Sequence, residues 1–543
     1  MSTLLIPGRH LITSQFMVDY LETILSTRAI GMEKVGLEIE KSIPIDQIVF
    51  LITSANQQGS RYNPVPLYAR IIGLERTVAT LREKYRVHIS YVPIPHLPTT
   101  QDFAASLIKY AEAHLRLSFR PEEAVIWTST PSLIANFHKN GYTVLPAELD
   151  MKTGVYHAAP PNTIIEELAK TKDYDQNSTY SLLSNATRTL WSDMPEIPAH
   201  IFRLWNEPLL TESGSLTETR DYSTYAVGMS HSEIMDVKFN DIRGGVLEGK
   251  IVDEGCADGA MMVRLAEAFP DSDIIGIDIT GEFISRVEER QRAGEFKKSF
   301  VFAYQRNLLQ PIFEENSINT TICNSTLHEI WSYGSQEQSL LAYLEEKYRQ
   351  LMPGGRLVIR DVVGPENKNE TVYLELSTTD GLTLDLEDTE ALLSADTRTL
   401  STESLLYRFK HNFLNDLCAS GRRDTAAKIQ FVVEYISEIK YFRMKMKDAF
   451  EFLSKKDYHD NWKSEMNEEF GFWSITEWTD TLTDIGFTIL QEDSIEPRYS
   501  RAYVSDWIVK NRWKDCVHIY KKVGEELVSL PYPVTTMVLV AQK

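Results

Sequence analysis

The sequence predicts an α/β protein with two Rossmann-like parallel sheets covered by helices and one helical insertion. Three observations lead to this. The 543 residues are too many for one compact core, since a domain holds roughly 100–200 residues. Short apolar runs alternate with helix-like stretches in two regions, 1–150 and 226–365. Residues 366–470 then interrupt the second pattern, so we expect a helix-rich insertion there.

The first region alternates strand and helix signals, as a parallel sheet with crossover helices requires. Its expected elements are strands at 47–53, 87–92 and 124–128 and helices at 64–84, 103–117 and 132–140. Residues 151–225 contain the proline-bearing loop Ala158–Asn162 and a short amphipathic helix near 163–171. We interpret 151–225 as a linker between two domains.

The second region, 226–543, gives stronger strand signals around the insertion. The expected strands before the insertion are 250–254, 273–278, 299–303, 318–323 and 356–360. After it, a helix at 475–485 and strands at 487–490 and 535–540 resume the pattern. The sheet of this domain therefore uses both sides of the insertion.

The chain is acidic: 77 Asp and Glu against 56 Lys and Arg give a net charge of −21. Phosphate backbones and anionic lipids would be repelled over most of such a surface, which excludes a general nucleic-acid coat protein. Four cysteines lie far apart without zinc spacing, and no metal site is predicted. No signal-peptide pattern and no run of eighteen apolar residues is found, so we expect a cytoplasmic protein without membrane contact.

The sharpest motif lies at the end of the strand 250–254. Asp253 is followed by three small residues, Gly255, Ala257 and Gly259, and then by a helix. Small residues allow a ligand to approach the backbone, and the helix start offers free N–H groups. Asp278 ends the next strand, 278 − 259 = 19 residues after the last glycine, where an acid can bind a ribose diol. An adenosine-containing cofactor is therefore expected.

The spacing argues against a dinucleotide. The small residues alternate without the longer gap of a G-x-G-x-x-G fingerprint. Asp253, before the first glycine, would repel a pyrophosphate, but it would attract an ammonium or sulfonium group.

These motifs resemble those of the class I S-adenosylmethionine-dependent methyltransferases. The first motif of that family, D-x-G-C-G-x-G, corresponds to Asp253-Glu-Gly-Cys-Ala-Asp-Gly259. Further matches are Gly276–Asp278, Asn324–Glu329, Leu351–Ile359, Gly486-Phe487 and Met537–Ala541. The resemblance covers 226–365 and 470–543, and it implies S-adenosylmethionine as cofactor. Ala257 in place of the middle glycine, and Asn324 where the family often has Asp, depart from the pattern.

The resemblance also implies roles for single residues. Asp253, Gly255, Ala257 and Gly259 would line the methionine part of the cofactor, and Asp278 would bind the ribose. Asn307 would lie near the adenine, and Asn324 and Ser325 would flank the methionine tail and the transferred methyl group. An N-terminal helix that carries Tyr222, Tyr225, Met229 and His231 would fold over the cofactor or, equally, pack on the sheet.

His328 and Asp361 are the candidate catalytic residues. His328 follows the fourth strand of the second domain and can titrate near neutral pH, as a general base must. Asp361 ends the fifth strand at the same sheet edge, where ligands bind in open α/β sheets. Glu329 and Tyr333 compete for the same role, and structural roles for His328 and Asp361 stay open, because methyl transfer needs mainly alignment.

The N-terminal region weakly resembles the HIGH-type nucleotidyltransferases. The first strand ends in Gly8-Arg9-His10, and Asn63 and Arg70 follow the second. The second histidine of the family signature is missing, which puts nucleotide transfer in doubt. A bifunctional nucleotidyltransferase/methyltransferase and a non-catalytic S-adenosylmethionine-binding module are therefore the alternatives to a methyltransferase.

The sequence does not identify the methyl acceptor or the oligomeric state. Basic residues of the insertion could guide an anionic metabolite or lie on a solvated helix face; they are Arg408, Lys410, Arg422 and Arg423. An acidic chain with one short basic strip favours a small-molecule acceptor and does not exclude a short RNA.

Overall fold

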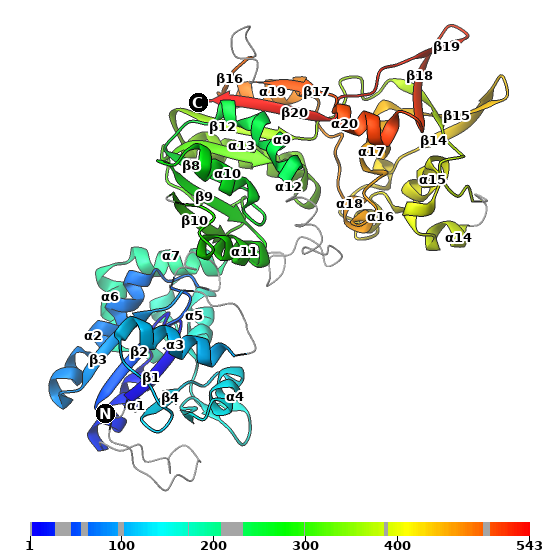
Figure 1. Cartoon of the computed structure of the whole chain (residues 1–543). Helices are drawn as coiled ribbons and strands as arrows, with labels where there is room; N and C mark the ends of the chain where they lie inside the picture. The colour runs from blue at the N-terminus through cyan, green and yellow to red at the C-terminus, as the bar shows by residue number, and fades with distance from the viewer. Residues whose placement is uncertain are drawn as a thin grey trace. The chain divides into compact units, whose positions relative to one another are not determined.

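The computed structural model describes residues 3–27, 45–55, 63–95, 102–171, 173–207, 232–297, 299–384, 389–491 and 500–543 (Figure 1). The chain divides into two compact units, Met1–Pro208 and Leu209–Lys543. In the described ranges, no helix combines the length and the apolar character that crossing a membrane requires.

The first unit contains a five-stranded parallel sheet in the order β3-β2-β1-β4-β5. The strands are β1 (Thr3–Gly8), β2 (Gln47–Ile52), β3 (His88–Pro93), β4 (Ala124–Trp127) and β5 (Thr143–Leu145). The connecting helices are α1 (Gln15–Thr27), α2 (Leu67–Tyr85), α3 (Phe103–Leu115) and α4 (Pro131–Lys139). All six residues of β2 are buried, as expected for a parallel strand covered on both faces.

The described residues of the segment interpreted as a linker, 151–171 and 173–207, contain three α-helices. The helices α5 (Pro161–Ala169), α6 (Asn185–Asp193) and α7 (Glu196–Trp205) bury apolar faces in one core that also contains Leu11 and Val65. Residues 161–205 therefore pack as part of the first unit. Their short helices alternate with turns, and for this reason the sequence did not distinguish them from a connection.

The second unit contains an eight-stranded sheet, with β10-β9-β8-β11-β12-β20-β16 as its main path and β17 paired to β20 (Figure 1). The strands are β8 (Lys250–Glu254), β9 (Asp273–Asp278), β10 (Phe300–Gln305), β11 (Ile318–Asn324), β12 (Leu351–Asp361), β16 (Thr488–Ile489), β17 (Arg501–Tyr503) and β20 (Thr536–Gln542). From β10 to β12 the neighbours are parallel, and β20 runs antiparallel to β12. The predicted α/β fold with parallel sheets is confirmed.

The strand order of this sheet reverses between β8 and β11, because the chain first builds outward to β10 and then returns to β11. At such a switch point, loops from adjacent strands separate and leave a crevice at the carboxyl ends. The sequence motifs at Asp253, Asp278, Asn324 and Asp361 all stand at this edge.

The helices that accompany this sheet are α9 (Ser232–Ile242), α10 (Ala260–Ala268), α11 (Gly281–Arg292), α12 (Leu327–Tyr333), α13 (Glu337–Gln350) and α19 (Ile475–Ile485). A buried ion pair fixes α13 to the sheet: Lys347 Nζ lies 2.6 Å from Glu254 Oε1, and both side chains are inaccessible to solvent. The hydroxyl of Tyr343 donates to the other oxygen of Glu254. Glu254 is thus a structural residue of the strand that precedes the glycine-containing loop.

The insertion differs from the helical segment that we expected. It contains an antiparallel sheet, β14-β15-β13-β18-β19, besides helices. The strands are β13 (Thr371–Leu376), β14 (Phe431–Ile436), β15 (Ile439–Lys445), β18 (Val517–Val523) and β19 (Glu526–Ser529). Its helices include α14 (Thr389–Ser394), α15 (Thr402–Asn412), α16 (Asn415–Ala419), α17 (Met446–Lys455) and α18 (Trp462–Glu465), while α20 (Asp506–Ile508) lies beyond residue 470.

A tight hairpin explains the difference. Ser437 and Glu438, which connect β14 and β15, both have positive φ angles of 50° and 67°. Two consecutive positive φ angles are typical of hairpin turns, but such turns normally contain Asn or Gly, and neither residue is present here to predict the turn. The basic residues of 440–447 therefore belong largely to a strand. The last two strands come from beyond residue 470, since β18 pairs with β13.

Candidate active site

The loop between β8 and α10 requires glycine at two positions. Gly255 has φ +74°, and a Cβ there would lie 2.7 Å from Thr326 Cγ2 and closer still to its hydroxyl oxygen. Gly259 has φ +81°, and its Cβ would lie 2.9 Å from Val287 Cγ2. Ala257 also has a positive φ, 46°. The backbone therefore bends closely around the carboxyl end of β8 and presents the start of α10 to the crevice.

Asp278 stabilises this loop through hydrogen bonds to backbone N–H groups. Its Oδ2 accepts the N–H of Ala257 at 3.0 Å, and its Oδ1 accepts the N–H of Thr280 at 2.8 Å. Burial raises the pKa of Asp278 to about 6, although both backbone donors act in the opposite direction. A carboxylate has about four acceptor positions, and the two backbone N–H groups and the Thr280 side chain fill three of them, so the predicted contact with a ribose hydroxyl is compatible with this geometry.

Asp253 lies in an environment in which a positively charged ligand group would stabilise its carboxylate. Its side chain is buried, and its Oδ2 has no hydrogen-bond partner. Burial, then Asp278 and Glu254, raise the pKa of Asp253 to about 7. A buried carboxylate oxygen without a donor is costly, and a ligand ammonium or sulfonium group beside Oδ2 would offset that cost. The site therefore fits the positively charged methionine end of S-adenosylmethionine.

Lys238 is a residue of this site that sequence reasoning missed. It is buried on α9, and its Nζ lies 3.3 Å from Ser325 Oγ at the end of β11. Burial, followed by Arg360, lowers the pKa of Lys238 to about 7. Asp241, one turn further, fixes α9 by accepting bonds from Arg360 at 2.9 Å and Arg501 at 2.6 Å. A single lysine in an amphipathic helix carries no signal that separates it from a surface lysine.

His328 and Asp361, the predicted catalytic residues, are in contact. The Nδ1–H group of His328 donates to Asp361 Oδ1 at 2.7 Å. The other oxygen of Asp361 accepts the N–H groups of Thr326, Leu327 and His328 at 3.2, 2.7 and 3.4 Å. Asp361 thus both orients the imidazole and caps the start of α12.

Glu468 lies on the opposite side of the imidazole. Its Oε2 is 3.6 Å from His328 Nε2, and the hydroxyl of Tyr333 donates to its Oε1 at 3.1 Å. Burial alone would lower the pKa of His328, but Asp361 and then Glu468 raise it to about 9. Burial alone would raise the pKa of Asp361, and the imidazole instead holds it below its ordinary value. The pair is therefore an imidazolium and a carboxylate at neutral pH.

This pair predicts a pH-dependent stability. Because the folded pKa of His328 exceeds the unfolded value of about 6.5, its stabilising contribution is complete below about pH 6.5. It is lost as the pH rises through about 9. The difference in unfolding free energy between wild type and His328→Gln, measured by urea titration with a chelator present, should therefore shrink between about pH 6 and pH 10. A difference that stays constant across this range would contradict the assignment.

Two arginines of the predicted basic strip have structural roles at α12. Arg423 is buried, and its Nη2 donates to the carbonyls of Trp331 and Ser332 at 3.1 and 2.9 Å. Arg422 donates to the carbonyl of Tyr333 at 2.7 Å. Cations at a helix C-terminus satisfy free carbonyls and oppose the helix dipole. The side chain of Arg423 is thereby enclosed within the protein, whereas Arg422 stays exposed.

The remaining predicted site residues are placed as follows. Asn324 ends β11, and the adjacent Ser325 has φ 59° and contacts Lys238. Asn307 follows β10, and its Oδ1 accepts the N–H of Leu309 at 3.0 Å, so it closes a turn. Tyr222, Tyr225, Met229 and His231 lie outside the described residues.

The N-terminal residues that resemble a nucleotidyltransferase signature lie in the first unit and bond mainly to backbone carbonyls. Nε2 of His10 donates to the carbonyl of Ile6 at 2.9 Å, and burial lowers its pKa to about 4. Arg70 is buried and donates from Nη1 to the carbonyls of Arg9 and Thr53, both at 3.2 Å. Asn63 donates to the carbonyl of Ser54 at 2.9 Å. These contacts stabilise the chain directly after β1 and β2. Because the lowered pKa leaves His10 neutral at pH 7, its side chain offers no positive charge that would attract a triphosphate.

An acidic, glycine-lined loop at the switch point of a parallel sheet, with an antiparallel strand β20, defines a cofactor-binding α/β enzyme domain. Residues 248–407 match the family described as "Methyltransferase domain". The second unit thus contains a methyltransferase domain, and the prediction of a methyltransferase is confirmed. The resemblance of the first unit to nucleotidyltransferases is not confirmed. No curated protein matches the chain.

Solved structures offer only distant similarities. A S-adenosylmethionine-dependent methyltransferase from Mesorhizobium loti is 13% identical, with a TM-score of 0.28, over 59% of this chain and 100% of that chain. One from Methanosarcina mazei is 15% identical, with a TM-score of 0.27, over 55% and 95%. Geranyl diphosphate C-methyltransferase from Streptomyces coelicolor is 17% identical, with a TM-score of 0.22, over 29% and 57%. These TM-scores are too low to assign any property of those proteins to this chain.

Proposed function

We propose that the second unit transfers the methyl group of S-adenosylmethionine to a small-molecule acceptor. The observation that carries the proposal is Asp253: a buried carboxylate with one oxygen lacking a hydrogen-bond partner, at a glycine-containing loop of a methyltransferase domain. A sulfonium is already a good leaving group, so S-adenosylmethionine supplies an activated methyl group when bound. The protein has to hold this group in line with the acceptor and exclude water.

The cofactor end of the site offers groups of opposite charge. Asp253 would bind the ammonium group of the methionine part, and Lys238, beside Ser325, would bind its carboxylate. Asp278 would bind the ribose hydroxyls, while Gly255 and Gly259 let the loop approach the ligand. Ala257, Asn307 and Asn324 keep the supporting roles that the family resemblance implies.

His328 and Asp361 would act on the acceptor. Asp361 holds Nδ1, which leaves Nε2 as the nitrogen that faces the acceptor. Because the pKa of His328 is raised to about 9, Nε2 can take a proton from an acceptor only in the fraction of the protein in which the imidazolium has lost its own proton. Asp361 is then a positioning residue. The ring of Phe470 packs edge-on against His328 with ring centroids 5.0 Å apart, and the side chain of His328 is only 8% exposed. Such enclosure favours a small acceptor over RNA, as does the burial of Arg423.

The test is cofactor affinity. Asp253→Asn should weaken S-adenosylmethionine binding at least tenfold in calorimetry, because charge-assisted contacts contribute about 1.5–3 kcal/mol. Asp273→Asn, the same change at the exposed start of β9, is the matched control and should bind like wild type.

Two outcomes would sink the proposal: no binding of S-adenosylmethionine by wild type, or equal affinities for Asp253→Asn and wild type. Formation of S-adenosylhomocysteine with the ultrafiltrate of a cell extract separates an enzyme from a non-catalytic binding module. Turnover that needs the retained fraction and is lost after ribonuclease treatment would replace the small molecule by RNA.

A further inference from the structure

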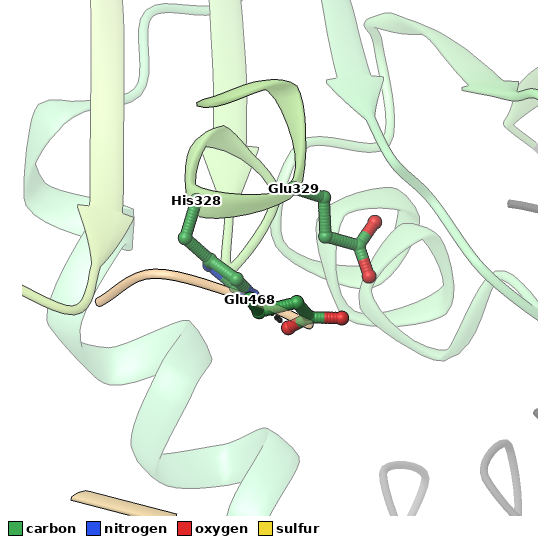
Figure 2. A group of neighbouring side chains, drawn as sticks. All are labelled: His328, Glu329 and Glu468. Carbon is green, nitrogen blue, oxygen red and sulfur yellow. Dashed lines mark ion pairs between the residues drawn. The ribbon is translucent and has the colours of Figure 1, made fainter. Parts of the chain in front are cut away.

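Three potential metal ligands from two distant parts of the second unit converge at the acceptor side. Figure 2 shows His328 and Glu329 side by side on α12, with Glu468 reaching toward the imidazole from a separate segment. One ligand atom from each of the three residues lies within 4.8 Å of the others. His328 and Glu468 are buried, and Glu329 is half-buried.

The imidazole is oriented as in metal sites. A ligating histidine typically donates its second ring N–H to a carboxylate, which fixes the ring and the tautomer. Asp361 accepts the Nδ1–H of His328 at 2.7 Å and so directs Nε2 to Glu468, whose Oε2 is 3.6 Å away. Two ligands that each lie about 2.1 Å from one ion are about 3–4 Å apart, so this spacing accommodates an ion after a small inward turn of Glu329.

The segment that carries Glu468 is fixed before any ligand binds. The carbonyl of Glu468 accepts a bond from Lys455, and the N–H of Glu469 donates to Ser332 Oγ at 2.8 Å. Glu451, paired with Lys455 at 2.6 Å, accepts the N–H of Gly471 at 2.7 Å. The position of Glu468 is therefore set by the protein backbone, as a metal site with a preformed geometry requires.

Negative charge exceeds positive charge around this space. Asp361, Glu468 and Glu329 face one imidazole. Two cations of the insertion pair with other carboxylates, Lys455 with Glu451 at 2.6 Å and Arg423 with Glu469 at 2.8 Å. A buried excess of carboxylates is costly unless a cation compensates it. A divalent ion brings more charge than a proton on His328.

We propose that His328, Glu329 and Glu468 bind one divalent cation, with Asp361 as the residue that orients His328. One imidazole and two carboxylates suit Mn²⁺ and Zn²⁺ better than Ca²⁺, which takes oxygen ligands. Resting on the proposed function, the ion would hold an oxygen of the methyl acceptor, so the acceptor would carry a hydroxyl or carboxylate group at or beside the methylated atom. His328 then contacts the acceptor through the ion.

The experiment titrates chelator-treated full-length protein with Mn²⁺ and follows free Mn²⁺ by electron paramagnetic resonance. We expect one Mn²⁺ per chain, displaced by Zn²⁺. His328→Gln and Glu329→Gln should each weaken binding at least tenfold, as the loss of a ligand does. Glu345→Gln, the same change at an exposed position of α13, should leave binding unchanged.

Glu329→Gln alters only a half-buried side chain, so it tests the site even if substitutions of the buried ligands prevent folding. S-adenosylmethionine affinity, measured on the same samples, reports the proposed function independently of the metal. Absence of Mn²⁺ and Zn²⁺ binding to wild type would overturn the metal site, and so would binding that Glu329→Gln and Glu345→Gln affect equally.

Discussion

Replacing Lys347 by methionine is expected to lower the unfolding free energy of the second unit by about 3–5 kcal/mol. The substitution keeps most of the side-chain volume and removes only the charge. It leaves Glu254 fully buried without its ion pair, whose atoms are 2.6 Å apart. Because desolvated carboxylates are stabilised mainly by such partners, the effect should exceed that of most single substitutions.

Urea unfolding followed by tryptophan fluorescence would measure this change. Lys297→Met is the matched control, since Lys297 forms a 2.7 Å pair with Glu267 in which both side chains are about two-thirds exposed. Exposed pairs contribute roughly 0–1 kcal/mol. The double variant Glu254→Gln/Lys347→Met should recover part of the loss, because the unpaired charge is gone. Equal effects of Lys347→Met and Lys297→Met would refute the importance of the buried pair.

Replacing Gly255 by alanine should abolish measurable S-adenosylmethionine binding, a loss of at least a hundredfold. The new Cβ would overlap Thr326, 2.7 Å from its Cγ2, and the positive φ of 74° adds strain of about 1–2 kcal/mol. Relief requires the loop to move away from β11, which displaces Asp253 and the start of α10 together. A misplacement of about 1 Å is enough to lose such a site.

The Gly354→Ala variant separates the effect of backbone strain from the effect of the overlap with Thr326. Gly354 has a similar φ of +80°, but a Cβ there would meet nothing within 4 Å, so only backbone strain is introduced. This control should bind the cofactor like wild type. Thr326→Ala combined with Gly255→Ala removes the overlapping atoms and should restore part of the affinity. If Gly255→Ala binds as well as Gly354→Ala, the close contact with Thr326 does not shape the site.

Local patterns explain how much of the fold was predictable. Short local patterns predict the strands β8, β9 and β11 and the loop at Gly255. The apolar runs and glycines in these stretches are compatible with a single interpretation. His328 and Asp361 could be placed at one sheet edge because parallel strands bring their carboxyl ends together. The 2.7 Å contact between them follows from the helix start at α12, which Asp361 caps.

Residues that depend on distant segments were not predictable. Glu468 is 140 positions from His328, and only the folding of the insertion brings the two together. Lys238 enters the site because Asp241 anchors α9 to β12 and β17, a contact without a local signal. The hairpin of β14 and β15 was missed because Ser437 and Glu438 form its turn. The pairing of β13 with β18 places Tyr373 opposite Tyr520, which lies beyond the end of the insertion at residue 470.

The position of β20 has a consequence for synthesis of the protein on the ribosome. Strand β12 needs β20, residues 536–542, as its antiparallel neighbour, and β16 and β17 attach to β20 as well. Residues 250–361 can form the parallel part of the sheet as they emerge, but its open edge at β12 persists until residue 542 has been translated. The sheet of the first unit does not depend on strands from the end of the chain, because this unit ends near residue 208. Nascent chains of the second unit therefore expose an unpaired strand for a long time and are the stage at which chaperones would be most needed.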